Sequence, residues 1–441
     1  MENSDFRVSA RGSHSAPKSR QVFSIPELAT LVARFSTQQD CARLLQTSKA
    51  LYDITVPFVW EVVQGAQHLL LLISEAASYH PTFGEKGLEI YLTESFRAST
   101  DIFTRFDFYA SHVKYLDVYG PKGETFKVTG WKVLVARAQQ KILLPNLHTL
   151  VIKTVSDTNG PNQPMWIGTF SSPSLVNLLI TDGNLWDTPT VSYPAASFMM
   201  KSLAAHQPKL ERLELFPFSE VGNYVDEGES NLLAFLSGDP FYKYAVYFTS
   251  LKHLSCTFAW FEGPALQILG QLPHLETIDV CGVDEPEEAS SELSEDSFPS
   301  LRSLYLHMSN PFDAAIILMI TQMLKGLTSL RILLDIVGLI NAMVDEQLWL
   351  TEDFFPLLLN APNVTDLWID ADPNNELEDE IEIDRSVLEV FHQLPLKSLH
   401  LGQICMSDED LQSNLAWVWP SISRLSMPRQ PISFTLLSLF T

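Results

Sequence analysis

The chain has 441 residues, 46% of them hydrophobic and 11% aromatic, which supplies enough apolar side chains for a large packed core and excludes a mostly disordered protein. Its 29 basic and 53 acidic residues give a formal net charge of −24. Phosphate backbones and anionic lipids are repelled by such a charge, so neither nucleic acid nor a membrane is an expected partner. The longest apolar runs, such as Leu69–Ile73 and Ala314–Ile320, are far shorter than the roughly 18 residues of a membrane span.

Residues 1–21 are predicted to form a disordered N-terminal arm. They carry dispersed basic residues among Ser and Gly, without the apolar stretch of a signal peptide. The cysteines, at positions 41, 256, 281 and 405, show no Cys-x-x-Cys spacing, and this usage is typical of a reducing compartment. We therefore expect a cytoplasmic protein, a nuclear protein, or one found in both compartments.

Residues 22–62 show the pattern of short amphipathic helices. Pro26 suits the first turn of a helix, and apolar residues then recur with helical spacing. These positions are Leu28, Leu31, Val32 and Phe35, followed in a second helix by Leu44 and Leu45. So short a segment cannot bury this much apolar surface by itself, so we predict that it docks on a partner.

This segment resembles the F-box, the helical module that docks on the Skp adaptor of cullin-RING ubiquitin ligases. The resemblance rests on the Ile25-Pro-Glu-Leu28 opening, the apolar pairs, the Thr47-Ser-Lys49 stretch and the closing Trp60. It departs from the common pattern at Leu51-Tyr52, where many members carry Trp-Arg. The resemblance implies an adaptor contact made by Ile25, Pro26, Leu28, Leu31, Val32, Leu44, Leu45 and Trp60. The alternative is a helical cap that covers the first of the repeats that follow.

Residues 63–112 are predicted to be a connecting helix and a first irregular unit. They contain the phrase Phe103-Thr-Arg-Phe-Asp-Phe-Tyr109. This phrase, together with the loose repeats after it, resembles the F-box proteins that are abundant in mushroom-forming fungi. The resemblance implies a fungal, mushroom-type F-box protein with irregular leucine-rich repeats.

From residue 113 to residue 428, an apolar phrase of the form L-x-x-L-x-L recurs. The phrases begin at Val113, Leu147, Leu175, Leu210, Leu251, Leu275, Leu301, Leu330, Val364, Leu396 and Ile422. A proline often stands two residues before the start, where it ends the preceding helix. The alternation inside each phrase predicts a strand, and helical stretches lie between the phrases. In the phrase at Leu330, Asp335 occupies the last apolar position, which predicts a bulge or a slipped register.

The phrases resemble leucine-rich repeats, although the Asn or Cys that usually follows the strand is replaced, for example by Val155 and Gly183. The predicted fold class is an α/β solenoid, namely an irregular leucine-rich-repeat horseshoe (113–428) preceded by a small all-α F-box-like module. Residues 429–441 are predicted to be a C-terminal tail or cap. Strands would line the concave face, and each unit would be stabilised by its neighbours.

The sequence contains no G-x-S-x-G, H-E-x-x-H, Walker or G-x-G-x-x-G motif, so we expect no enzyme, catalytic residue, cofactor or metal site. His148, His253 and His400 occupy outward strand positions and are interpreted as solvated side chains, the alternative being that they line a site on the concave face. The acidic runs Asp284–Asp296 and Asp370–Asp384 lack cation-loop spacing and are predicted to be solvated insertions. The alternative for the first run is a phosphorylated loop that changes partner affinity.

The predicted binding surface is the concave face, where basic and aromatic residues alternate with acidic ones such as Glu214. The candidate substrate-binding residues are Arg302, Tyr305, Arg331, Trp368 and Lys397. They predict a substrate with an acidic or phosphorylated segment, although they could equally be ordinary solvated strand positions.

Together with the F-box resemblance, this surface predicts the substrate-recognition subunit of a Skp–cullin–F-box ubiquitin ligase, with an unidentified protein substrate. The alternative is a leucine-rich-repeat scaffold protein with no role in ubiquitination.

Overall fold

The computed structural model describes Phe23 and residues 25–74, 76–79, 88–93, 102–123, 126–153, 162–181, 189–206, 209–218, 239–282, 293–308, 311–334, 350–371, 381–383, 385–406 and 422–428. The predictions for residues 1–21, for most of both acidic runs and for residues 429–441 lie outside the described residues.

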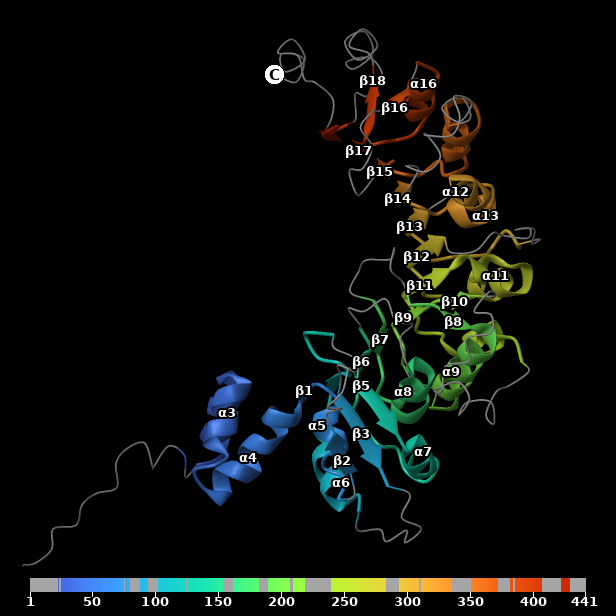
Figure 1. Ribbon diagram of the computed structural model, residues 1–441. Helices are drawn as coiled ribbons and strands as arrows, with labels where there is room; N and C mark the ends of the chain where they lie inside the picture. The colour runs from blue at the N-terminus through green and yellow to red at the C-terminus, as the bar shows by residue number, and fades with distance from the viewer. Residues whose placement is uncertain are drawn as a thin grey trace, which may run out of the picture.

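A twelve-stranded central sheet, in which the strand order follows the chain, organises the molecule. Its strands are β1 (Val62–Gln64), β4 (Tyr115–Asp117), β6 (Thr149–Val151), β7 (Asn177–Leu179), β9 (Arg212–Leu215), β11 (His253–Thr257), β12 (Thr277–Gly282), β13 (Ser303–Met308), β14 (Ser329–Leu334), β15 (Asp366–Asp370), β17 (Ser398–Gly402) and β19 (Arg424–Ser426). Every neighbouring pair is parallel. Figure 1 shows the strands following one another along a curved array.

Helices connect the strands and lie along one side of the array (Figure 1). They are α5 (Gln67–Leu70), α6 (Thr104–Ala110), α7 (Trp131–Ala138), α8 (Gln163–Phe170), α9 (Tyr193–His206), α11 (Gly263–Gly270), α12 (Pro311–Leu318), α13 (Thr321–Leu324) and α16 (Arg385–Gln393). The 3-10 helices are η1 (Phe241–Tyr247), η2 (Phe258–Phe261) and η4 (Phe355–Asn360), and η3 (Leu350–Phe354) is a π-helical segment. No described helix is both long enough and apolar enough to cross a membrane.

The strands alternate between a buried and a partly exposed face. In β13, Leu304 and Leu306 are fully buried, whereas Tyr305 and His307 point to the other face and stay partly exposed. A strand places successive side chains on opposite faces, so the leucines of the phrases form a continuous core under the sheet. The opposite row of side chains is left available for other contacts.

The apolar phrases coincide with strands, but one phrase begins three residues earlier than predicted. Leu330 pairs with Leu304 and with Leu367, the second apolar position of the neighbouring phrases. The phrase therefore starts at Leu327, which is fully buried, and continues through Leu330 and Ile332. Pairing is continuous along β14, so no bulge lies within this strand, and Asp335, to which the prediction referred, lies outside the described residues.

Three smaller sheets extend the array. Strand β2 (Ala76–Tyr79) runs antiparallel to β3 (Leu88–Leu92), which pairs in parallel with β5 (Phe126–Thr129). Strands β8 (Val191–Ser192) and β10 (Pro217–Phe218) form a parallel pair, as do β16 (Ile381–Ile383) and β18 (Ile404–Met406).

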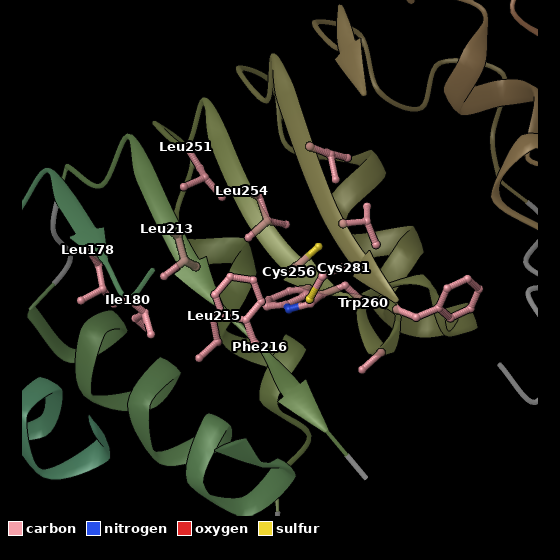
Figure 2. Close-up of a cluster of buried hydrophobic side chains, with 14 of the residues drawn as sticks. Leu178, Ile180, Leu213, Leu215, Phe216, Leu251, Leu254, Cys256, Trp260 and Cys281 are labelled. Atoms are coloured by element: carbon pink, nitrogen blue, oxygen red, sulfur yellow. The ribbon is translucent and has the colours of Figure 1, made fainter. Parts of the chain in front are cut away.

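The core is one cluster of buried side chains that runs from Val63 to Ile404. In its middle, Leu213, Leu215, Cys256, Cys281 and Trp260 converge between β9, β11 and β12 and the η2 turn (Figure 2). Burial raises the pKa of the Cys256 thiol well above its usual value, so this cysteine serves as a neutral core residue.

A second group in the core is aromatic. The ring of Trp166 stacks on Phe170 with centroids 5.6 Å apart and meets Trp131 edge-on at 4.7 Å. The indole N–H of Trp166 donates to the hydroxyl of Tyr119 at 3.2 Å. This group joins α7 and α8 to the end of the sheet that contains β4.

The predicted fold class, an irregular leucine-rich-repeat horseshoe behind a small all-α module, is corrected by this architecture. The structure has an α/β fold built on one twelve-stranded, all-parallel central sheet with helices. The N-terminal helices are joined to this architecture, since α4 contacts α6 through Trp60 and Tyr109 and is followed, after Glu61, by β1, the first strand of that sheet.

Candidate functional site

The first candidate surface is formed by α2 (Pro26–Phe35), α3 (Gln38–Leu44) and α4 (Lys49–Trp60). Helix α2 begins at Pro26, whose missing N–H costs nothing in a first turn. Helix α3 begins after Thr37, whose hydroxyl accepts from the backbone N–H of Asp40 at 3.1 Å. Helix α4 begins after Ser48, which accepts from the N–H of Leu51 at 3.3 Å. These caps fix the boundaries of three short helices.

Helix α2 has a buried face of small residues and an exposed face of large ones. Ala29 and Ala33 are each 1% exposed. The large apolar side chains of α2 and its N-cap residue are far more exposed, and they are Ile25 (45% exposed), Leu28 (40%), Leu31 (49%) and Phe35 (82%). This is the reverse of the usual arrangement, because large apolar side chains gain most from burial. A row of this kind typically marks a docking surface.

The predicted adaptor-binding residues divide between this exposed face and more protected places. Ile25, Pro26, Leu28 and Leu31 lie on the exposed face. Val32, Leu44 and Leu45 are half-buried. Trp60 lies elsewhere, at the end of α4, where its ring packs on Tyr109 of α6 with centroids 4.6 Å apart. Phe35, the most exposed of the row, belongs to the same helical stripe as Leu28 and Leu31.

Tyr109 also contacts Tyr52, which lies where the sequence departs from the common F-box pattern. The hydroxyls of Tyr52 and Tyr109 are 2.6 Å apart, and this hydrogen bond, with burial, raises the pKa of Tyr52. Nearby, the side-chain N–H group of Gln38 donates to the carbonyls of Val59 and Val62, both at 2.7 Å. The aromatic phrase at 103–109 thus holds α4 against the body of the molecule.

The second candidate surface lies on the partly exposed face of the sheet. Pairing places Asp279, Tyr305, Arg331, Trp368 and His400 opposite one another on β12, β13, β14, β15 and β17. Each is the fifth residue of its phrase once the β14 phrase is counted from Leu327. We call these five residues the cross-strand row.

Within the cross-strand row, three flat side chains are stacked. The guanidinium carbon of Arg331 lies 4.6 Å from the centroid of the Trp368 ring. The other neighbour of Trp368 is His400, with centroids 3.6 Å apart and an interplanar angle of 22°. Trp368 remains 37% exposed. A cation over a tryptophan ring is held electrostatically, so the guanidinium has a fixed orientation.

His400 is therefore more than the solvated side chain that was predicted. Burial lowers the pKa of His400; the neighbouring Asp370 opposes this effect and Arg331 adds to it. Its imidazole is thus neutral at pH 7. On the next outward position of the sheet, the ring nitrogen Nε2 of His307 lies 3.1 Å from Oδ1 of Asp279.

The predicted substrate-binding residues are only partly brought together. Tyr305, Arg331 and Trp368 lie side by side in the cross-strand row. Arg302 is turned away, donating to the backbone carbonyl of Leu301 at 2.7 Å. Lys397 is exposed at the start of β17 and lies outside the row. Asp279 and His400 were not among the predicted substrate-binding residues, and the sequence signal that groups them with the row is their shared fifth position in the phrase.

Glu214, predicted to be an exposed acidic position, is buried. Its Oε2 accepts from the backbone N–H groups of Ile180 and Thr181 at 2.7 and 2.8 Å and from the Thr181 hydroxyl at 3.1 Å. Its Oε1 accepts from Arg212 at 3.0 Å. Ladder pairing between β7 and β9 covers only Asn177–Arg212 and Leu178–Leu213. The Glu214 carboxylate satisfies the N–H groups where that ladder ends, so Glu214 is a structural residue.

No group of three or more His, Cys, Asp or Glu side chains in the described ranges is arranged to hold a metal ion. Comparison of the sequence with protein-family models gives no match, and comparison with curated proteins gives none either. The two surfaces described above are therefore the basis for assigning a function.

Proposed function

We propose that the protein is the substrate-recognition subunit of a Skp–cullin–F-box ubiquitin ligase, in which α2, α3 and α4 dock on the Skp adaptor and the exposed face of the sheet binds a protein substrate. The observation that carries this proposal is the exposed row of Ile25, Leu28, Leu31 and Phe35 on α2. It coincides with the segment that resembles the F-box.

The energetic case for docking follows from the side chains involved. Full burial of a leucine-sized side chain is worth about 1.5–3 kcal/mol, so covering this row would supply several kcal/mol toward binding. The small residues Ala29 and Ala33 are buried where α2 packs on α4, and the large side chains remain exposed. An exposed apolar surface of this kind lowers the solubility of the protein unless a partner covers it.

In this proposal the chain contributes no catalytic residue. It accelerates ubiquitin transfer by holding the substrate near the partner in the ligase that carries the ubiquitin. The two then react while held together and do not depend on a diffusional encounter. The four cysteines are free, and this supports a cytoplasmic or nuclear location, where such ligases act.

The test is co-purification of the full chain with a fungal Skp adaptor. We expect the wild-type chain to bind, and a chain with Leu28→Asp and Leu31→Asp to lose the adaptor, since a carboxylate in the docked surface would be desolvated. Both leucines are exposed, so the free energy of unfolding should change by no more than about 0.5 kcal/mol per site.

The matched control is Leu71→Asp, because Leu71 is 39% exposed but lies after α5, away from the proposed surface. This variant should bind the adaptor as the wild type does. The proposal fails if the folded wild-type chain does not bind the adaptor, or if the Leu28 and Leu31 double variant binds as well as Leu71→Asp. A scaffold without a role in ubiquitination would then be the better account.

A further inference from the structure

We propose that the cross-strand row binds the carboxylate of an Asp or Glu side chain in an unphosphorylated acidic segment of the protein substrate, with Arg331 as the residue that contacts it. The inference rests on the proposed function only in assuming that the partner on this face is a protein. Its argument comes from Arg331 and its neighbours.

Arg331 is held ready for a planar ligand. Its guanidinium lies against Trp368, which is supported from behind by His400. A long side chain normally loses conformational entropy when it binds a ligand. Because Arg331 is already stacked on Trp368, it loses less of this entropy on binding. A guanidinium in a fixed plane presents its N–H donors in a fork that matches both oxygens of a carboxylate.

Arg331 has no described acidic partner, whereas several other cations of the described residues do. Arg137 pairs with Asp107 at 2.6 Å, Arg212 with Glu214 at 3.0 Å and Lys252 with Glu211 at 3.0 Å. No described carboxylate lies within ion-pair distance of Arg331, although acidic residues outnumber basic ones by 53 to 29. Its Nε is buried without an acceptor. Because the Nε is closed to solvent, an anion from outside would be bound by the terminal nitrogens of the guanidinium, which have no described acidic partner.

The local charge favours a single negative charge over the two of a phosphate group. Asp366 and Asp370 lie at the two ends of β15, on either side of Trp368. His400 is neutral at pH 7 and adds no positive charge. A phosphate group would bring nearly two negative charges to one guanidinium beside these carboxylates, and phosphate sites generally need several cations. One carboxylate matches one guanidinium.

The test uses the full chain without the adaptor and fluorescein-labelled peptide pools. Each pool has one central residue, either Glu, Gln or phosphoserine, among degenerate uncharged residues. We expect the wild-type chain to prefer the Glu pool over the Gln pool by about tenfold, the usual worth of a charge-assisted hydrogen-bond pair. Arg331→Gln should abolish that preference.

Arg331→Lys is the second variant, because it keeps the positive charge and removes only the planar fork. It should bind the Glu pool several-fold more weakly than the wild type does. If Arg331→Gln does not fold, this variant replaces it in the test. Lys252→Gln is the matched control. It removes one positive charge at the start of β11, where Lys252 already pairs with Glu211, and it should retain the Glu preference.

Three results would overturn the proposal. They are equal binding of the Glu and Gln pools by the wild type, a Glu preference that survives in Arg331→Gln, and stronger binding of the phosphoserine pool than of the Glu pool. Since the adaptor is absent from this experiment, a failure here leaves docking through α2 untouched. A failure of adaptor docking likewise leaves the peptide result valid.

Discussion

Replacing Glu214 by Ala should be among the most damaging single changes to this protein. Glu214 is 2% exposed, and its carboxylate accepts the backbone N–H groups of Ile180 and Thr181. The alanine methyl group offers no acceptor, so two buried N–H groups would be left without partners at about 1–3 kcal/mol each. The ion pair with Arg212, whose side chain is 48% exposed, adds little because solvent screens it. We therefore expect a loss of about 4 kcal/mol in the free energy of unfolding.

Urea unfolding followed by far-ultraviolet circular dichroism measures the total loss. Amide hydrogen exchange at Ile180 and Thr181 tests its cause, since their N–H groups should lose protection before those of β12 and β13. Glu214→Gln keeps an oxygen that can accept both N–H groups and should cost only about 1 kcal/mol. The reasoning is refuted if Glu214→Ala unfolds within about 0.5 kcal/mol of the wild type, or if exchange at the two amides does not change.

Two further changes test the aromatic group in the core and the stacked side chains of Arg331, Trp368 and His400. Trp166→Ala empties the centre of the aromatic group around Phe170 and Trp131, so the free energy of unfolding should fall by about 3–5 kcal/mol; a thermal midpoint equal to that of the wild type would contradict this packing. His400 is protonated less readily in the folded state, so its contribution to stability is complete above pH 6.5 and declines as the pH falls below that value. His400→Gln should therefore lose less stability between pH 7.5 and pH 5.5 than the wild type; equal losses in urea midpoint would rule this out.

The strands were largely predictable because their signal is local. An alternating apolar pattern can bury one face only as a strand, and the prolines before the phrases limit where each strand begins. The phrase that was predicted to begin at Leu330 shows where such a local signal is not sufficient. Leu327 and Leu330 both suit a first position, and only pairing with Leu304 decides between them.

Features that depend on distant segments were not predictable in this way. Strand β1 carries no recurring phrase, yet it pairs with β4 and so extends the central sheet to the residues next to the N-terminal helices. The predicted fold class was overturned by the twelve-stranded, all-parallel arrangement of that sheet, which depends on pairing between distant segments. Glu214 occupies an outward position like that of Tyr305, and its burial depends on the short ladder between β7 and β9. The stack around Trp368 required the register of strands separated by insertions of different length.

The aromatic junction at Tyr109 makes the molecule a lever arm. Neighbouring strands lie about 4.8 Å apart, so the spacings between β1 and β19 in the twelve-stranded sheet add up to roughly 53 Å along the curved array. A tilt of about 10° between α4 and β1 would then displace the far strand by at most roughly 9 Å. A change in the hydrogen bond between Tyr52 and Tyr109, or in the packing of Trp60, that altered this tilt would therefore shift the opposite end of the sheet.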